Sequence, residues 1–261
     1  MDSFGLDRWV MSCLLVGLRI GPLFAFAPPF TLIRLPATAR LLFGLGLSVC
    51  LVGSGIPGVM LGGPADALPG TGALLIAAVR ELLIGTSLVM MFQLAFAALY
   101  VAGRTVDIQA GFGLAMLIDP TTRSQTPLVG TLFAYAAGAI FFAMGGHHDV
   151  LRLFAASFEA VPLGEGGLPG SILPVTGFLS AGFLIAFGVA GGAILAMFLA
   201  DLAIALLSRT VPQMNVLVMG FQVKTITLLL VLMLAFGSSG ALIARLITLM
   251  LISAPRVIGR G

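Results

Sequence analysis

The chain alternates long apolar stretches with short polar breaks, and this pattern predicts membrane helices. One apolar segment runs from Trp9 to Ala27 and ends where Pro28 and Pro29 remove backbone donors. Five further runs carry no charge and reach the roughly 20 residues that cross a hydrocarbon core as a helix. These runs are Leu41–Ala65, Leu82–Gly103, Ser124–His148, Gly166–Ala200 and Thr225–Ala244. We therefore expect an all-α, membrane-associated protein of about six long apolar helices or helical hairpins.

Composition strengthens this prediction. Of the 261 residues, 59% are hydrophobic and 9% charged, against about 25% charged in an ordinary soluble domain. The net charge of +3 comes without a run of basic residues, so nucleic acid is not expected as a partner. Cys13 and Cys50 lie in separate apolar segments, where we expect small buried hydrophobes rather than a disulfide or a metal site.

The polar connector Gly145–Thr176 is the best place to divide the chain, into a part spanning 1–165 and a terminal helical hairpin spanning 166–261. We expect Gly191-Gly192 to interrupt the first helix of that hairpin. His147 and His148 have one acidic neighbour and no HExxH spacing, so they are interpreted as loop or interface residues. No metal or cofactor is expected.

Charges inside apolar helices cost about 2.5–3.5 kcal/mol each at mid-depth, so they need partners or water. The charges in question are Arg19, Arg80, Glu81, Asp201 and Arg245. Structural ion pairs are favoured over an ion relay, since a relay needs several acidic or histidine groups. Arg80 and Glu81 are about 100° apart on a helix, so each is expected to pair elsewhere. With no GxSxG elbow and no facing pair of aspartates, catalysis is not expected.

The stretch AGFGLAMLIDPTTRSQTP, Ala110–Pro127, interrupts the helices in mid-chain. Glycines permit backbone angles denied to other residues, and Asp before Pro favours a turn or a new helix start. Non-helical backbone at membrane depth is tolerated only in a sheltered cavity, where an apolar loop can exclude water and ions. An ordinary connector remains the alternative. The candidate plug residues are Gly111, Phe112, Gly113, Leu114, Met116, Leu117, Ile118, Asp119 and Pro120.

Several motifs together resemble the FliR family, the flagellar members of the type III secretion export-gate proteins. The central motif comprises Gly111–Ala115, Asp119-Pro120, Ser124-Gln125 and Pro127, and the second comprises Arg209, Pro212, Gln213, Asn215, Gly220-Phe221 and Lys224. Further matches are Arg80-Glu81 with Gly85, Gly146-His147, Ser157-Phe158, and Pro162 with Gly164. The matches keep their order and spacing across essentially the whole chain.

This resemblance implies a non-enzymatic subunit that forms an export pore with FliP- and FliQ-like chains, in contact with FlhB- and FlhA-like proteins and membrane lipid. Unfolded flagellar proteins would cross the bacterial inner membrane through it, at the flagellar basal body, and the central loop would plug the closed channel. It also implies a FliP-like part followed by a FliQ-like hairpin. The residues expected at subunit or interhelix junctions are Arg80, Glu81, Asp201, Arg209, Pro212, Gln213, Asn215 and Lys224.

Two other functions stay open. One is a homologous subunit of a virulence-type secretion system. The other is a small-solute transporter with helices broken at glycines, for which Gly191-Gly192 and Asp201 are the supporting residues. A transporter of that kind would also need internal pseudo-symmetry, and no repeat of fixed period is present in the sequence.

Overall fold

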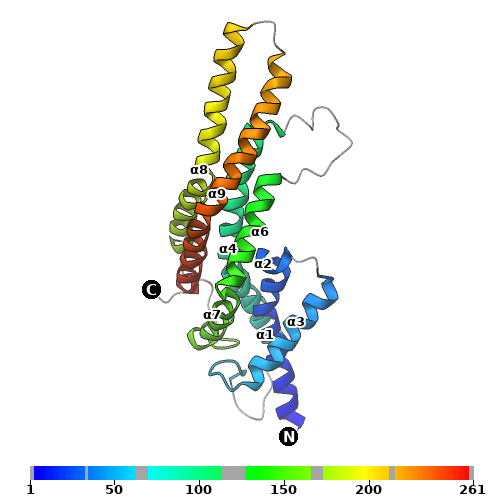
Figure 1. Cartoon of the computed structure of the whole chain (residues 1–261). Coiled ribbons are helices and arrows are strands. Elements are labelled where there is room, and N and C mark those ends of the chain that lie inside the picture. Colours follow the sequence, from blue (N-terminus) through cyan, green and yellow to red (C-terminus); the bar gives the residue numbers. More distant parts are fainter. Residues whose placement is uncertain are drawn as a thin grey trace. The chain divides into compact units, whose positions relative to one another are not determined.

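The computed structural model describes residues 3–32, 35–62, 70–112, 127–165, 173–211 and 215–258. Within these ranges the chain is helical and has no β-strand, which confirms the all-α prediction. The elements, labelled in Figure 1, are α1 (Ser3–Phe26), α2 (Pro28–Thr31), α3 (Ala37–Gly53), α4 (Thr71–Gln109), α6 (Leu128–Ala143), α7 (Gly146–Ala160), α8 (Leu173–Thr210), α9 (Val216–Ser253) and the 3-10 helix η2 (Ala254–Ile258).

These helices form two compact units, each built from segments far apart in the sequence. The first unit contains residues 1–94, 141–179 and 248–261, and the second contains residues 95–140 and 180–247. Both units are therefore assembled by chain segments from each side of residue 165. The division into a FliP-like part and a FliQ-like hairpin concerns likeness to other chains, and it stays a prediction.

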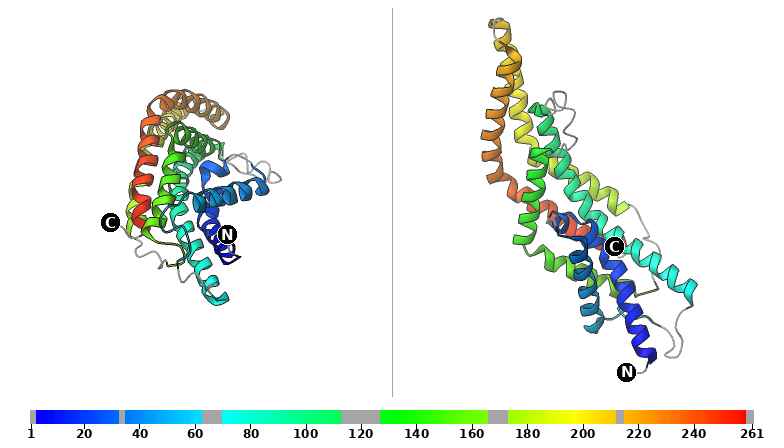
Figure 2. Two further views of the ribbon diagram at one scale, coloured as in Figure 1. Left: turned by 90° about the horizontal axis from the view of Figure 1, so that it is seen from below. Right: turned by 90° about the vertical axis from the view of Figure 1, so that its right-hand side faces the viewer.

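In the first unit, α1 packs against α3 (Figures 1 and 2). The predicted stop before Pro28-Pro29 is confirmed, because α1 ends at Phe26 and Ala27 is extended. The two prolines then begin the short α2, where their missing N–H groups cost nothing. Phenylalanine rings pack edge to face beneath this corner, with Phe30 centred 6.2 Å from Phe141.

In the second unit, the C-terminal part of α8 and the N-terminal part of α9 lie side by side (Figures 1 and 2). The predicted interruption at Gly191-Gly192 is wrong, since α8 is one helix through both glycines. Glycine in a helix interior costs only about 1 kcal/mol against alanine. The apolar residues on either side stabilise the helix by more than that cost.

In the part of the chain that the structure describes, three helices are long and apolar enough to cross a membrane: Gly5–Phe26, Thr71–Gln109 and Val175–Thr210. Helices α6 and α7 pass the same test only as a pair bent by 74°. The expectation of a full crossing within Leu41–Ala65 is wrong, because α3 ends at Gly53 after 17 residues. Ser54 and Gly55 follow in a turn, with Gly55 at φ +71°.

Two further expectations need correction. Much of the supposed connector Gly145–Thr176 is the amphipathic helix α7, whose buried face repeats every three or four residues at Val150, Phe154 and Phe158. Cys13 is buried as expected, but Cys50 is exposed. Helix α3 buries Gly44, Ser48 and Val52 at a spacing of four, and a residue two positions from Ser48 lies about 200° around the helix.

Candidate functional site

A buried arginine forms the most polar point inside the first unit. The side chains of Arg19 on α1 and Glu81 on α4 are both fully buried. Arg19 Nε donates to Glu81 Oε2, and Nη2 donates to Oε1 at 3.0 Å. A contact through two hydrogen bonds is the strong form of an arginine–carboxylate ion pair. It confirms the prediction that Arg19 and Glu81 each have a partner.

The end of α7 completes the surroundings of Arg19. Its Nη1 donates to the backbone oxygens of Ser157 and Val161, each at 3.0 Å. The Phe158 ring lies 4.2 Å from the guanidinium carbon, as a cation–π contact. The Gly164 N–H donates to Glu81 Oε1 at 3.1 Å. We call these residues the Arg19 centre. It joins α1, α4 and the end of α7 through charge-assisted hydrogen bonds between fully buried side chains and backbone groups.

Close backbone approach supports the Arg19 centre. A Cβ atom on Gly85 would lie 2.1 Å from the backbone oxygen of Arg19, so any side chain at this position would push α1 away from α4. Glu81 and Gly85 are one helical turn apart and therefore face the same way. One binds the arginine side chain, and the other leaves room for its backbone.

In the second unit, α9 holds the end of α4 where the central stretch begins. The Nζ of Lys224 donates to the backbone oxygen of Gln109 at 3.1 Å and pairs with Asp201 Oδ1 at 2.6 Å. Phe112 packs against Phe221 with ring centroids 6.4 Å apart. Phe112 is the last described residue before the gap, and residues 113–126, which include the remaining candidate plug residues, lie outside the described part of the chain.

The start of α6, after the central stretch, is held by α4. Asp107 is buried, and its carboxylate accepts hydrogen bonds from the Val129 N–H at 3.1 Å and from the Gly130 N–H at 3.4 Å. These are donors of the first helical turn, which have no partner within the helix. A Cβ on Gly103 would lie 2.5 Å from Gly130 Cα, so the two helices touch through their backbones.

Asp107 is thus a side-chain cap supplied by another helix, and sequence reasoning missed it. The available signal was an aspartate in the last turn of an apolar helix, where the helix dipole disfavours a negative charge. Such a residue needs donors from elsewhere. We call Asp107, Lys224 and their partners the anchors of the central stretch, since they hold residues on both sides of it.

We expect Asp107→Ala to loosen the first turn of α6. Removing the cap leaves two buried N–H groups unpaired, which costs about 1–2 kcal/mol and corresponds to a roughly 5–30-fold change in a local equilibrium. Amide hydrogen exchange in peptides covering residues 127–135 should accelerate accordingly. The matched control is Thr105→Ala, whose hydroxyl bonds only to Val101 O of the same helix. Equal exchange in both variants would contradict the capping role.

Comparison with known proteins gives the family. A model of bacterial export proteins, family 1, matches residues 10–250. The chain is 31% identical over 217 residues to the flagellar biosynthetic protein FliR of Bacillus subtilis, covering 81% of this chain and 80% of that protein. The chain belongs to the FliR family of bacterial export proteins. It is also 29% identical over 163 residues to the secretion system apparatus protein SsaT of Salmonella typhimurium, covering 60% of this chain and 61% of that protein.

A third relative is the Yop proteins translocation protein T of Yersinia pestis, 32% identical over 149 residues, which covers 56% of this chain and 57% of that protein. Three of the FliR-like matches, which are far apart in the sequence, meet at the Arg19 centre. Glu81 and Gly85 come from one motif, Ser157 and Phe158 from another, and Gly164 from a third. Arg19 itself belonged to none of the motifs, although Glu81, Ser157 and Phe158 contact its side chain and Gly164 binds Glu81.

Three of the remaining junction residues of the FliR-like signature are described, and they lie at the ends of helices or on an exposed surface. Arg80 is exposed on α4. Arg209 is exposed in the last turn of α8, where its positive charge interacts favourably with the helix dipole. Asn215 Oδ1 accepts a hydrogen bond from the Val218 N–H at 3.4 Å, at the start of α9. Pro212 and Gln213 lie outside the described residues. The role of these residues in contacts with other subunits stays a prediction.

Proposed function

We propose that this chain is a non-enzymatic subunit of a type III protein export gate in the bacterial inner membrane, at the flagellar basal body. It would form the pore with FliP- and FliQ-like chains, bind FlhB- and FlhA-like proteins, and pass unfolded flagellar proteins. Membership of the FliR family carries the proposal. The names of the relatives include flagellar and Yop secretion components, so a virulence-type system is the neighbouring alternative.

The anchors of the central stretch support a plug in particular. A segment that closes a channel must be fixed at its ends, because a loosely tethered loop would not return to one closed position. Lys224 and Phe221 hold the α4 side of the stretch, and Asp107 holds the α6 side. Between these ends the sequence supplies Gly111 and Gly113, followed by the apolar run Leu114–Ile118, of the kind that excludes water from a constriction.

The transporter alternative loses its main support. It relied on a helix broken at Gly191-Gly192, whereas α8 continues through both residues. Asp201 was its other supporting residue, and this carboxylate pairs with Lys224 at 2.6 Å. This ion pair accounts for the charge of Asp201 in an apolar helix without a transported ion.

The test is ion conductance through purified gates that contain this chain and its FliP- and FliQ-like partners, reconstituted in planar bilayers. Deleting Gly111–Ile118 should raise the conductance of the closed gate severalfold or more, while the partners still copurify. Replacing the apolar residues of that run with serine should act in the same direction. The matched control permutes the same residues among Leu, Met and Ile, which keeps the run apolar and should keep the gate closed.

An unchanged conductance after deletion, in gates that have assembled, would rule out the plug. Failure of the purified chain to associate with FliP- and FliQ-like partners would instead contradict the pore-subunit role. The alanine variants of Arg209, Gln213 and Asn215 address that role separately. We expect them to reduce copurification with both partners, and undiminished copurification would count against a junction at these residues.

A further inference from the structure

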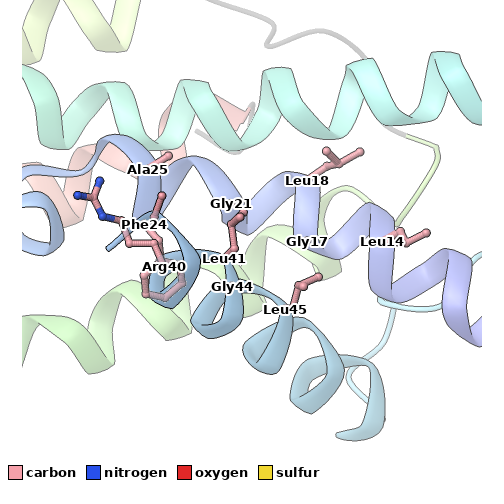
Figure 3. Close-up of a pocket in the computed structure, with 11 residues that line it drawn as sticks. Leu14, Gly17, Leu18, Gly21, Phe24, Ala25, Arg40, Leu41, Gly44 and Leu45 are labelled. Carbon is pink, nitrogen blue, oxygen red and sulfur yellow. The ribbon is translucent and has the colours of Figure 1, made fainter. Parts of the chain in front are cut away.

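A groove of about 660 Å³ runs between α1 and α3 in the first unit. This volume falls within the roughly 300–1,000 Å³ of small-molecule pockets. Figure 3 shows the residues on its two sides and Arg40 at the end opposite Leu14. The walls are otherwise apolar, and the residues that the following argument uses are Leu14, Gly21, Arg40, Leu41, Gly44 and Leu45.

The groove exists because small residues line it where larger ones would fill it. A Cβ on Gly21 would meet no heavy atom within 4 Å, and one on Gly44 would meet only a Phe24 ring carbon at 3.8 Å. At the rim, Leu14 is 56% and Leu41 67% exposed. Helix α1 is long and apolar enough to cross a membrane, and α3 is an apolar helix beside it. Such a surface is stable against hydrocarbon and costly against water.

One positive charge stands at the end of this apolar groove. Arg40 lies in the first turn of α3, is half-buried, and donates from Nε to the backbone oxygen of Leu35 at 3.2 Å. Among the described residues no carboxylate forms an ion pair with it. Its remaining guanidinium donors are therefore suited to an external anion, in a geometry that matches a phosphate.

We propose that the groove binds an anionic phospholipid, with one acyl chain along α1 and α3 and the phosphate at Arg40. The two parts of the lipid match the two features of the groove. The acyl chain packs against the apolar walls, and the negative headgroup pairs with the guanidinium of Arg40. Basic sites beside membrane helices favour anionic headgroups on the same grounds. An apolar helix of a neighbouring subunit would match the walls but would leave the positive charge of Arg40 without a counterion. The inference does not depend on the export role.

The test is native mass spectrometry of the delipidated full-length chain in detergent, titrated with phosphatidylglycerol or with phosphatidylcholine of the same acyl chains. Phosphatidylglycerol should bind more tightly. Arg40→Gln should weaken its binding about tenfold, since a charge-assisted hydrogen bond contributes roughly that factor, and should leave phosphatidylcholine nearly unchanged. Gly21→Leu fills the groove and should abolish the binding of both lipids. Gly44→Leu provides a second filling variant if the first fails to fold.

The matched control is Gly191→Leu, because Gly191 also lies inside a long helix with nothing within 4 Å of its Cβ. It should bind phosphatidylglycerol as the unmodified chain does. Lipid binding that survives both filling variants would overturn the proposal, as would equal affinity for the two headgroups. A cysteine at Leu41 that crosslinks to a partner subunit in the assembled gate, with no lipid retained, would assign the groove to a protein helix instead.

Discussion

Glu81→Gln should destabilise the chain by about 3–5 kcal/mol, the cost of removing one partner from a buried ion pair. Glutamine nearly keeps the shape of glutamate, so the loss comes from charge rather than packing. Arg19 would remain fully buried with its positive charge uncompensated, because the backbone oxygens, the Ser157 hydroxyl and the Phe158 ring around it carry no negative charge. Since total stabilities are about 5–15 kcal/mol, this one change should remove a large share of the whole.

The measurement is unfolding of the purified chain in detergent, followed by circular dichroism or protease resistance. Arg80→Gln is the matched control, because Arg80 is the preceding residue on the same helix and is exposed. It should shift stability by less than about 0.5 kcal/mol. The double variant Arg19→Met with Glu81→Met should recover part of the loss, since it leaves no buried charge. The single variants Arg19→Met and Glu81→Met complete the comparison. If their losses of stability added up to the loss in the double variant, the ion pair would not be the cause.

Gly103→Ala should destabilise the contact between α4 and α6 by about 1–3 kcal/mol, the usual cost of overpacking. The added Cβ would lie 2.5 Å from Gly130 Cα and 2.6 Å from Gly130 N, and backbone atoms cannot move aside as a side chain can. This is opposite in sign to the ordinary effect of glycine to alanine in a helix, which stabilises by about 0.5–1 kcal/mol. The sign therefore separates a backbone contact from simple helix propensity.

Gly192→Ala is the control for Gly103→Ala, since Gly192 is exposed on α8 with nothing within 4 Å of its Cβ. The two variants should move the unfolding midpoint of the chain in opposite directions. Gly130→Ala should behave like Gly103→Ala, because its Cβ would lie 2.7 Å from the backbone oxygen of Tyr100. Stabilisation by Gly103→Ala would contradict the close approach and, with it, the fixed spacing at the anchors of the central stretch.

The sequence predicted helices well where the signal was local. The apolar segment before Pro28-Pro29 is α1, and the run that includes Leu82–Gly103 lies inside α4. Prediction failed where glycines or polar residues were given more weight than the helical pattern of the apolar residues around them. The two glycines of α8 were interpreted as a break, although the long apolar helix around them outweighs their propensity. The polar residues near His147 concealed an apolar face of helical period in α7.

The candidate sites show the same limit. The sequence indicated that Glu81 and Arg19 needed partners, but it did not reveal that they pair with each other, 62 residues apart. Asp107 could be noticed as an acid in an unfavourable place, but the amides that it caps lie on another helix, 22 residues further along. The contacts of Lys224 with Asp201 and Gln109 O join three helices. Spacing along the chain carries no information about such choices.

By itself, then, the sequence determined the all-α membrane class, the end of α1 and the FliR-like motifs, because each depends on residues within a few turns of one another. Only the tertiary structure decided that three of those motifs meet around a buried arginine outside them, and that both ends of the central stretch are anchored. It also decided that a groove with one cation stays open beside α3. The physical reason is that packing between helices decides which groups lie close to a buried charge. An unpaired buried charge is costly, so an arrangement in which each buried charge has a partner is favoured.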